Sequence, residues 1–272
     1  MPFPGGEMMT TFAVSDTPPA DGPDFKPTHP WDAWFFPSLV AIFWVGLVMG
    51  FGGDMVYKAK QGQLTFPLIV HVHAAVYVGW MVLLTTQVAL IRKGRSDLHR
   101  KLGVASLGFV PVMLLVGPMA AFTTQTARFG TPASDPAFLA IQLGGLVSFA
   151  ILIVAALLNR KDAALHKRLV LLSTLTLVDA GFARWVGPIW GPVLGPALGS
   201  PFWTNYLILY GCTAALMLSI GVYDLVTRGR LLPGYVLGLI LAMSGHFIIV
   251  TAYLNPAWGV FCKGLIGGLA GH

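Results

Sequence analysis

The sequence contains few charged residues: Asp, Glu, Lys and Arg make up 10% of its 272 positions, whereas soluble domains carry about 25%. Hydrophobic residues account for 56% of the chain, and the mean hydropathy is +0.73. This balance excludes a soluble globular domain. It predicts an integral membrane protein of the all-α class, because a spanning helix satisfies its own backbone hydrogen bonds in lipid.

Cysteine is scarce as well. Cys212 and Cys262 are the only two, which is too few for a disulfide framework, and their spacing is not that of a zinc site. The sequence has no nucleophile motif, no phosphate-binding loop and no pair of catalytic carboxylates. These absences leave enzymatic activity open and turn attention to the few ionisable residues inside the apolar runs.

Acidic residues are outnumbered, with 11 Asp and Glu against 17 Lys and Arg and a net charge of +6. A basic chain can bind nucleic acid, but here the basic residues lie in short connections between apolar runs, which is the pattern of membrane topology. We therefore expect the lipid bilayer as a partner and no nucleic acid. The shortage of acidic residues within the runs disfavours a pump built on a chain of carboxylates.

Seven apolar runs dominate the chain, each close to the ~20 residues that a membrane-spanning helix requires. Their short connections predict a bundle of antiparallel neighbours over residues 34–254. Residues 1–33, rich in Pro, Gly, Ser and Asp, are predicted to be a disordered or interfacial tail, and residues 255–272 a second interfacial tail. The runs cover residues 34–53, 66–91, 102–124, 137–158, 169–190, 203–226 and 232–254.

The basic residues are distributed unevenly between the two ends of these runs. Positive charge accumulates on the cytoplasmic side of membrane proteins. The distribution therefore predicts a cytoplasmic amino end and an external carboxyl end. We expect a multi-pass protein of the bacterial inner membrane. The predicted inner side holds twelve basic residues, Lys26, Arg92, Lys93, Arg95, Arg100, Lys101, Arg160, Lys161, Lys167, Arg168, Arg228 and Arg230, and the outer side four, Lys58, Lys60, Arg128 and Lys263.

His71 and His73 lie two residues apart in the second run, which places them about 200° apart on a helix. The helical stripe that continues from His73 carries Tyr77 and Trp80, whereas the face of His71 carries small residues suited to close helix packing. We therefore predict that His73 is the site histidine, with Tyr77 and Trp80 beside it, and that His71 forms an interhelical hydrogen bond. A packed structural histidine is the alternative for His73.

His246 lies in the seventh run, at about the same depth from the outer end as His73. Two imidazoles on separate helices can be the axial ligands of a b-type haem. We therefore predict that His73 and His246 are the metal ligands of haem b in the outer half of the bundle, where the cofactor would serve electron transfer.

Asp179 and Arg184 lie in the fifth run, where contact with lipid would cost each on the order of 3 kcal/mol. Both are therefore expected to point inward. They are about 140° apart on a helix, so each should have a partner elsewhere: a haem propionate or another anion for Arg184, and a histidine N–H or a proton path for Asp179. Structural ties within the bundle are the alternative.

The Gly–Pro repeat over residues 187–201 predicts a stiff outer loop.

His99 and His166 open the third and fifth runs in two similar motifs, LHRKL and LHKRL, which begin 67 residues apart. The repeat suggests two related hairpins. The two histidines are candidates for a second pair of cofactor ligands on the inner side. The alternative is that both are surface residues beside lipid headgroups.

The second run with His73, the basic turn after it and the LHRKLG motif around His99 resemble a set of uncharacterised bacterial polytopic membrane proteins. They are also distantly similar to the YozB/CtaM family, which is linked to the maturation of haem-A-containing terminal oxidases. The resemblance covers about residues 66–124 and repeats faintly at 160–190. It implies that His73 and His99 matter and points to haem or respiratory chemistry, with respiratory-chain proteins or quinone as partners.

Three functions therefore remain open. The first is electron transfer through haem b held by His73 and His246. The second is a non-enzymatic assembly or interaction protein of the respiratory membrane. The third is a small-solute or proton transporter that uses Asp179 and Arg184, and it is weakened by the lack of paired Gly/Pro breaks in the runs.

Overall fold

The computed structural model describes residues 25–271, and this part of the chain consists of nine α-helices and two short 3₁₀ segments without a strand. Seven helical stretches are long and apolar enough to cross a membrane, which confirms the predicted all-helical class and the predicted number of spans. Residues 1–24 of the predicted amino-terminal tail lie outside the described residues. The elements are α1 (Asp32–Lys60), α2 (Leu68–Arg92), α3 (Ser96–Ala105), η1 (Ser106–Gly108), α4 (Phe109–Arg128), η2 (Pro136–Phe138), α5 (Leu139–Leu158), α6 (Ala163–Leu198), α7 (Pro201–Arg228), α8 (Pro233–Tyr253) and α9 (Pro256–Ala270).

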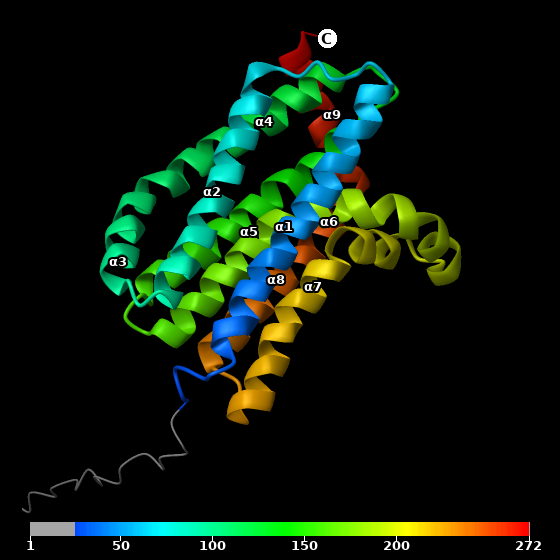
Figure 1. Cartoon of the computed structure of the whole chain (residues 1–272). Helices are drawn as coiled ribbons and strands as arrows, with labels where there is room; N and C mark the ends of the chain where they lie inside the picture. The colour runs from blue at the N-terminus through cyan, green and yellow to red at the C-terminus, as the bar shows by residue number, and fades with distance from the viewer. Residues whose placement is uncertain (1–24, 272) are drawn as a thin grey trace, which may run out of the picture.

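The helix α6 is the central element of the bundle and the most buried of the seven spans. It packs against α1, α5, α7 and α8 (Figure 1). The helix α2 packs mainly on α4 and also contacts α1, and α4 in turn contacts α5. The core between these helices is formed by large apolar side chains, among them Phe43, Phe149, Leu172, Leu175 and Met217. Ionisable residues on the inner faces of α6 are therefore held in an apolar, tightly packed environment.

Local chemistry sets the turn between α6 and α7. Gly199 adopts a left-handed conformation (φ +58°) that closes α6, as is usual for a residue just past a helix end. The Ser200 side chain then accepts a hydrogen bond from the backbone N–H of Trp203, and Pro201 occupies the first turn of α7. The two helices are consequently joined by a two-residue turn and run antiparallel.

The predicted stiff outer loop is helical instead. The helix α6 continues through Pro188, Pro192 and Pro196 to Leu198, although a proline inside a helix removes an N–H donor and crowds the carbonyl four residues earlier. Figure 1 shows the end of α6 and the start of α7, in yellow-green and yellow, leaving the bundle sideways. The Gly–Pro repeat therefore forms a helical hairpin beside the bundle.

The carboxyl-terminal segment, predicted to be an interfacial tail, forms α9 and packs against α4 and η2. Cys262 and Ile266 are fully buried in this contact, and the indole N–H of Trp258 donates to the carbonyl of Ala137 at 3.0 Å. The segment is thus part of the packed protein.

Candidate functional site

A buried polar cluster lies where α6, α7 and α8 meet. It consists of Asp179 on α6, Thr213 and Tyr210 on α7, and His246 on α8, and all four side chains are buried. Thr213 donates its hydroxyl to Oδ1 of Asp179. Oδ2 of the same carboxylate lies 3.3 Å from Nε2 of His246, and the imidazole stacks on the Tyr210 ring with 4.1 Å between centroids and 8° between planes.

The cluster leaves several of its polar atoms without a hydrogen-bond partner. Nδ1 of His246 and the hydroxyl of Tyr210 are buried and unpartnered, and the 3.3 Å contact between Nε2 of His246 and Oδ2 of Asp179 does not have hydrogen-bond geometry. Each such group ordinarily costs about 1–3 kcal/mol, and native interiors contain few of them. Their concentration around one carboxylate and one imidazole singles out this cluster as the candidate site.

The chemistry of such a pair is proton exchange. A carboxylate and an imidazole in contact can exist as an ion pair or as a neutral acid beside a neutral ring, and in an apolar interior the balance between these forms follows the surroundings. The position of Asp179 inside a span led us to expect a histidine N–H as one of its partners. The structure brings His246 to this position.

His73, the other predicted metal ligand, has different surroundings. Its helix α2 packs mainly against α1, α3 and α4, whereas α8, which carries His246, packs against α5, α6 and α7. The His73 ring stacks on Tyr77 at 4.1 Å between centroids, and its Nδ1 is buried without a partner. The paired ligation of haem by His73 and His246 stays a prediction, and these packing contacts give it no support.

The predicted neighbours of His73 have structural partners. The Tyr77 hydroxyl donates to the carbonyl of Met113 at 3.2 Å. The indole N–H of Trp80 donates to Oγ1 of Thr174 at 3.2 Å, and the Trp80 ring is buried in the core. These two side chains join α2 to α4 and to α6.

His71 and Arg184 are both exposed, and neither lies in the buried cluster. The His71 ring lies edge-on to Phe66, which precedes its own helix, at 6.2 Å between centroids. Arg184 donates to the carbonyl of Ala180 at 2.8 Å, and its guanidinium lies 4.6 Å from the centre of the Phe51 ring. As expected from their spacing, Arg184 and Asp179 do not pair with each other.

His99 and His166 are half-buried at the start of α3 and of α6 and are close enough to interact electrostatically. Nδ1 of His166 lies 2.8 Å from the carbonyl oxygen of Ala156, which favours the tautomer with a proton on Nδ1 and a free Nε2. Nδ1 of His99 is buried and unpartnered. Within residues 25–271 no group of three or more His, Cys, Asp or Glu side chains is arranged to hold a metal ion.

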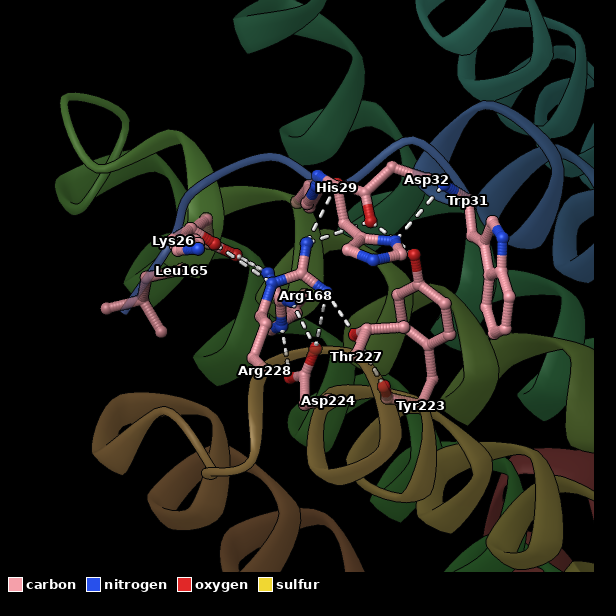
Figure 2. A network of polar contacts seen from close by, with 12 residues as sticks. Lys26, His29, Trp31, Asp32, Leu165, Arg168, Tyr223, Asp224, Thr227 and Arg228 are labelled. Atoms are coloured by element: carbon pink, nitrogen blue, oxygen red, sulfur yellow. Dashed lines mark hydrogen bonds and ion pairs between the residues drawn. The ribbon is translucent and has the colours of Figure 1, made fainter. Parts of the chain in front are cut away.

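A second ionic cluster, which the sequence analysis missed, lies at the end of the bundle where α1 and α6 begin and α7 ends (Figure 2). Its centre is a bidentate ion pair between Arg168 and Asp224, both without exposed surface. Arg168 donates from Nε to Oδ2 of Asp224 at 2.6 Å and from Nη2 to Oδ1, and a third donor reaches the carbonyl of Ala164 at 2.7 Å. This pair joins α6 to α7 with all of its strong hydrogen-bonding groups engaged.

The same cluster extends to α1 through Asp32. Its carboxylate accepts two hydrogen bonds from Arg228 at 2.8 and 2.9 Å, one from Lys167 at 2.7 Å and one from the Tyr223 hydroxyl at 2.5 Å (Figure 2). Phe25 covers the assembly, with its ring centre 4.9 Å from the guanidinium of Arg168. The amino-terminal segment is thereby attached to α6 and α7.

This cluster was missed because Lys167, Arg168 and Arg228 count in sequence as part of the positive-inside pattern. The informative signal was acidic: Asp32 and Asp224 stand at the ends of runs that otherwise lack acidic residues. A carboxylate at a strongly basic helix end is a candidate partner for a buried arginine.

The two clusters form successive layers on the same helix pair. Arg168 and Asp179 are about three helical turns apart on α6, as are Asp224 and Thr213 on α7. The antiparallel register therefore opposes Arg168 to Asp224 in one layer and Asp179 to Thr213 in the other.

No known protein family, curated protein or solved structure matches the chain. Its function therefore has to be inferred from these side chains and their geometry.

Proposed function

We propose that this multi-pass membrane protein is a transporter in which the Asp179–His246 pair binds and releases a proton as a small solute passes. The observation that carries the proposal is a buried carboxylate and imidazole, 3.3 Å apart inside the bundle, with polar atoms left unpartnered around them. Ionisable residues within membrane spans are costly, and they commonly belong to ion pathways and proton relays.

The Arg168–Asp224 layer shows how a purely structural ion pair looks in this bundle, and the Asp179–His246 pair differs from it. In that layer Arg168 and Asp224 form a bidentate pair, and Arg168 also donates to a backbone carbonyl. In the Asp179 layer one carboxylate oxygen and both imidazole nitrogens have no hydrogen-bond partner. A pair retained for stability alone would be expected to resemble the fully hydrogen-bonded Arg168–Asp224 pair.

Tyr206 and Tyr210 support a route from the start of α7 to the pair. Tyr206 is half-buried, and its ring centroid lies 6.0 Å from that of Tyr210, which stacks on His246. Asp179 interacts electrostatically with both phenols. Phenol hydroxyls both donate and accept hydrogen bonds, and because the Tyr210 hydroxyl has no partner in the protein, a relay through it requires a bridging water.

The proposal is tested by infrared titration of the purified protein in nanodiscs and by proton entry into proteoliposomes that contain a pH-sensitive dye. We expect a carboxylic C=O band that appears on acidification in the wild type and is lost in Asp179→Asn. Acid-driven proton entry should fall about tenfold or more in Asp179→Asn and in His246→Gln. The matched control is Asp97→Asn, because Asp97 is an exposed carboxylate on α3. A titration and a proton flux unchanged in Asp179→Asn would contradict the proposal.

Haem b held by His73 and His246 is the second candidate. The support for it is that Nδ1 of His73 and both nitrogens of His246 are buried without partners, so each ring has a nitrogen to offer to iron. A reduced-minus-oxidised Soret difference that is lost in His73→Ala and in His246→Ala, but kept in His71→Ala, would favour this function. A colourless protein from cells supplied with haem would exclude it.

We also propose that the amino end faces the cytoplasm of a bacterial inner membrane and the carboxyl end faces outward. The excess of Lys and Arg at one set of connections supports this orientation. The start of α1 and the carboxyl-terminal helix α9 lie at opposite ends of the bundle (Figure 1), as an odd number of spans requires.

A further inference from the structure

Arg184 differs from Arg168 and Arg228, the two arginines at the centre of the ionic cluster. Arg168 and Arg228 both have carboxylate partners, whereas none of the ion pairs among residues 25–271 includes Arg184. Its contacts are the carbonyl of Ala180 and the face of Phe51. The guanidinium therefore keeps most of its five N–H donors for another group.

The nearest acidic residue does not serve as that group. Asp54 interacts with Arg184 electrostatically but beyond ion-pair distance, and its carboxylate is bound by Lys58 at 2.7 Å. Arg184 is exposed on the surface of the bundle but lies away from the helix end: Phe51, on which it lies, precedes the end of α1 at Lys60 by nine residues, or about 13.5 Å along the helix. A cation at that depth is expected to have an anionic partner.

Residues of α2 complete the surroundings of Arg184. His73 interacts with it electrostatically and has a buried, unpartnered Nδ1. The ring of Tyr77 stacks on His73, and the ring of Phe51 lies under the guanidinium. A planar cation lying on one aromatic ring is therefore within electrostatic range of an imidazole that stacks on a second ring.

We propose that Arg184 and His73 bind the carboxylate of an organic monoanion, with Phe51 and Tyr77 contacting its apolar part. A guanidinium binds two carboxylate oxygens with parallel hydrogen bonds. Arg184 supplies the positive charge in the site, Arg128 adds a second at longer range, and the Asp54 carboxylate offsets part of this charge and so disfavours a dianion. The inference rests on the proposed function, because it names the class of solute that would accompany the proton.

The two sites lie at neighbouring depths on different faces of α6, because Asp179 contacts α7 and α8 whereas Arg184 lies toward α1 and α2. Asp179 lies five residues before Arg184 on α6, or about 7.5 Å along the helix axis. A carboxylate that crosses together with one proton carries no net charge through the bundle, which lowers the electrostatic cost of transit in an apolar medium.

The test is isothermal titration of benzoate into the full-length protein in phosphatidylcholine nanodiscs, which contain no anionic lipid. We expect binding by the wild type, a loss of about tenfold or more in Arg184→Gln and a smaller loss in Arg184→Lys, which keeps the charge but not the two-pronged geometry. Arg160→Gln is the matched control, since Arg160 is exposed in the turn before α6 and should leave binding unchanged. Thermal unfolding of each variant verifies that it is folded.

The outcomes separate this inference from the proton site. Wild-type affinity in a folded Arg184→Gln variant, or no benzoate binding by the wild type, overturns the carboxylate site while an infrared titration of Asp179 still stands. Benzoate binding that depends on Arg184 without any titration of Asp179 supports the carboxylate site and removes the proton function. Binding of inorganic phosphate or of phosphatidylglycerol, added in separate titrations, without binding of benzoate also overturns the assignment to carboxylates.

Discussion

Arg168 and Asp224 show at the scale of single residues how the bundle accommodates charge. Both side chains are completely buried, and they neutralise each other through two hydrogen bonds in a planar fork. Desolvating two ions is costly, so such a pair contributes little net stability, but removing one partner leaves an uncompensated charge. The pair therefore makes the fold depend on both residues together.

Replacing Asp224 by Asn should destabilise the protein by about 3 kcal/mol, because the Arg168 charge would remain buried with a neutral partner. The measurement is the unfolding transition in detergent, followed by circular dichroism. Asp97→Asn breaks an exposed pair with Arg95 and should change stability by about 0.5 kcal/mol or less. The double change Arg168→Met with Asp224→Leu should recover most of the loss. Equal transitions for Asp224→Asn and Asp97→Asn would refute the role given to the buried pair.

At the scale of helices, α1 and α6 are joined by close backbone contact. A Cβ atom added to Gly50 would lie 1.9 Å from the carbonyl oxygen of Gly181, so no side chain fits there. Small residues at such crossings let membrane helices approach until their backbones touch. The position of Asp179, two residues before Gly181, is fixed by this contact.

Gly50→Ala should therefore push α1 away from α6 and lower stability by about 1–3 kcal/mol. Gly52→Ala is a control on the same helix, because a Cβ there meets nothing within 4 Å, and it should be neutral or slightly stabilising through helix propensity. Thermal unfolding of the two variants in the same detergent decides the point. A Gly50→Ala variant as stable as Gly52→Ala would show that the crossing tolerates separation.

The docking of α9 gives a third prediction, at the same scale. Cys262 is fully buried against the bundle, and burial raises the pKa of its thiol. Because maleimides react with the thiolate, Cys262 in a Cys212→Ser background should be labelled slowly at pH 8 and rapidly after denaturation. Trp258→Ala removes the hydrogen bond to Ala137 and should accelerate labelling. Labelling of the native protein at the rate of a free thiol would mean that α9 is undocked.

At the scale of the whole molecule, the proposed orientation in the membrane depends on the unequal distribution of Lys and Arg between the two sets of connections. In a background without native cysteines, Gln63→Cys lies in the turn between α1 and α2, and Ser96→Cys lies at the start of α3. An impermeant maleimide added to intact cells should label Gln63→Cys, and should label Ser96→Cys only after permeabilisation. The reverse pattern would place the amino end outside.

At this scale the fold was largely predictable. Spans 34–53, 66–91 and 232–254 were expected, and the structure has α1, α2 and α8 there. The prediction of a loop over 187–201 was wrong, because α6 continues through its prolines to Leu198. The buried cluster was predicted in part: Asp179 and His246 were singled out as site residues, but with separate roles.

The sequence by itself determined that the chain is an all-helical membrane protein with seven spans. Those properties depend on composition and run length, which are measured against the fixed thickness of a bilayer. Only the tertiary structure decided that Asp179 meets His246, that Arg168 meets Asp224 and that Arg184 is left without a carboxylate. Lipid is as apolar as the protein core, so hydrophobic periodicity does not mark the buried face of a membrane helix, and the choice of partners depends on how the helices pack.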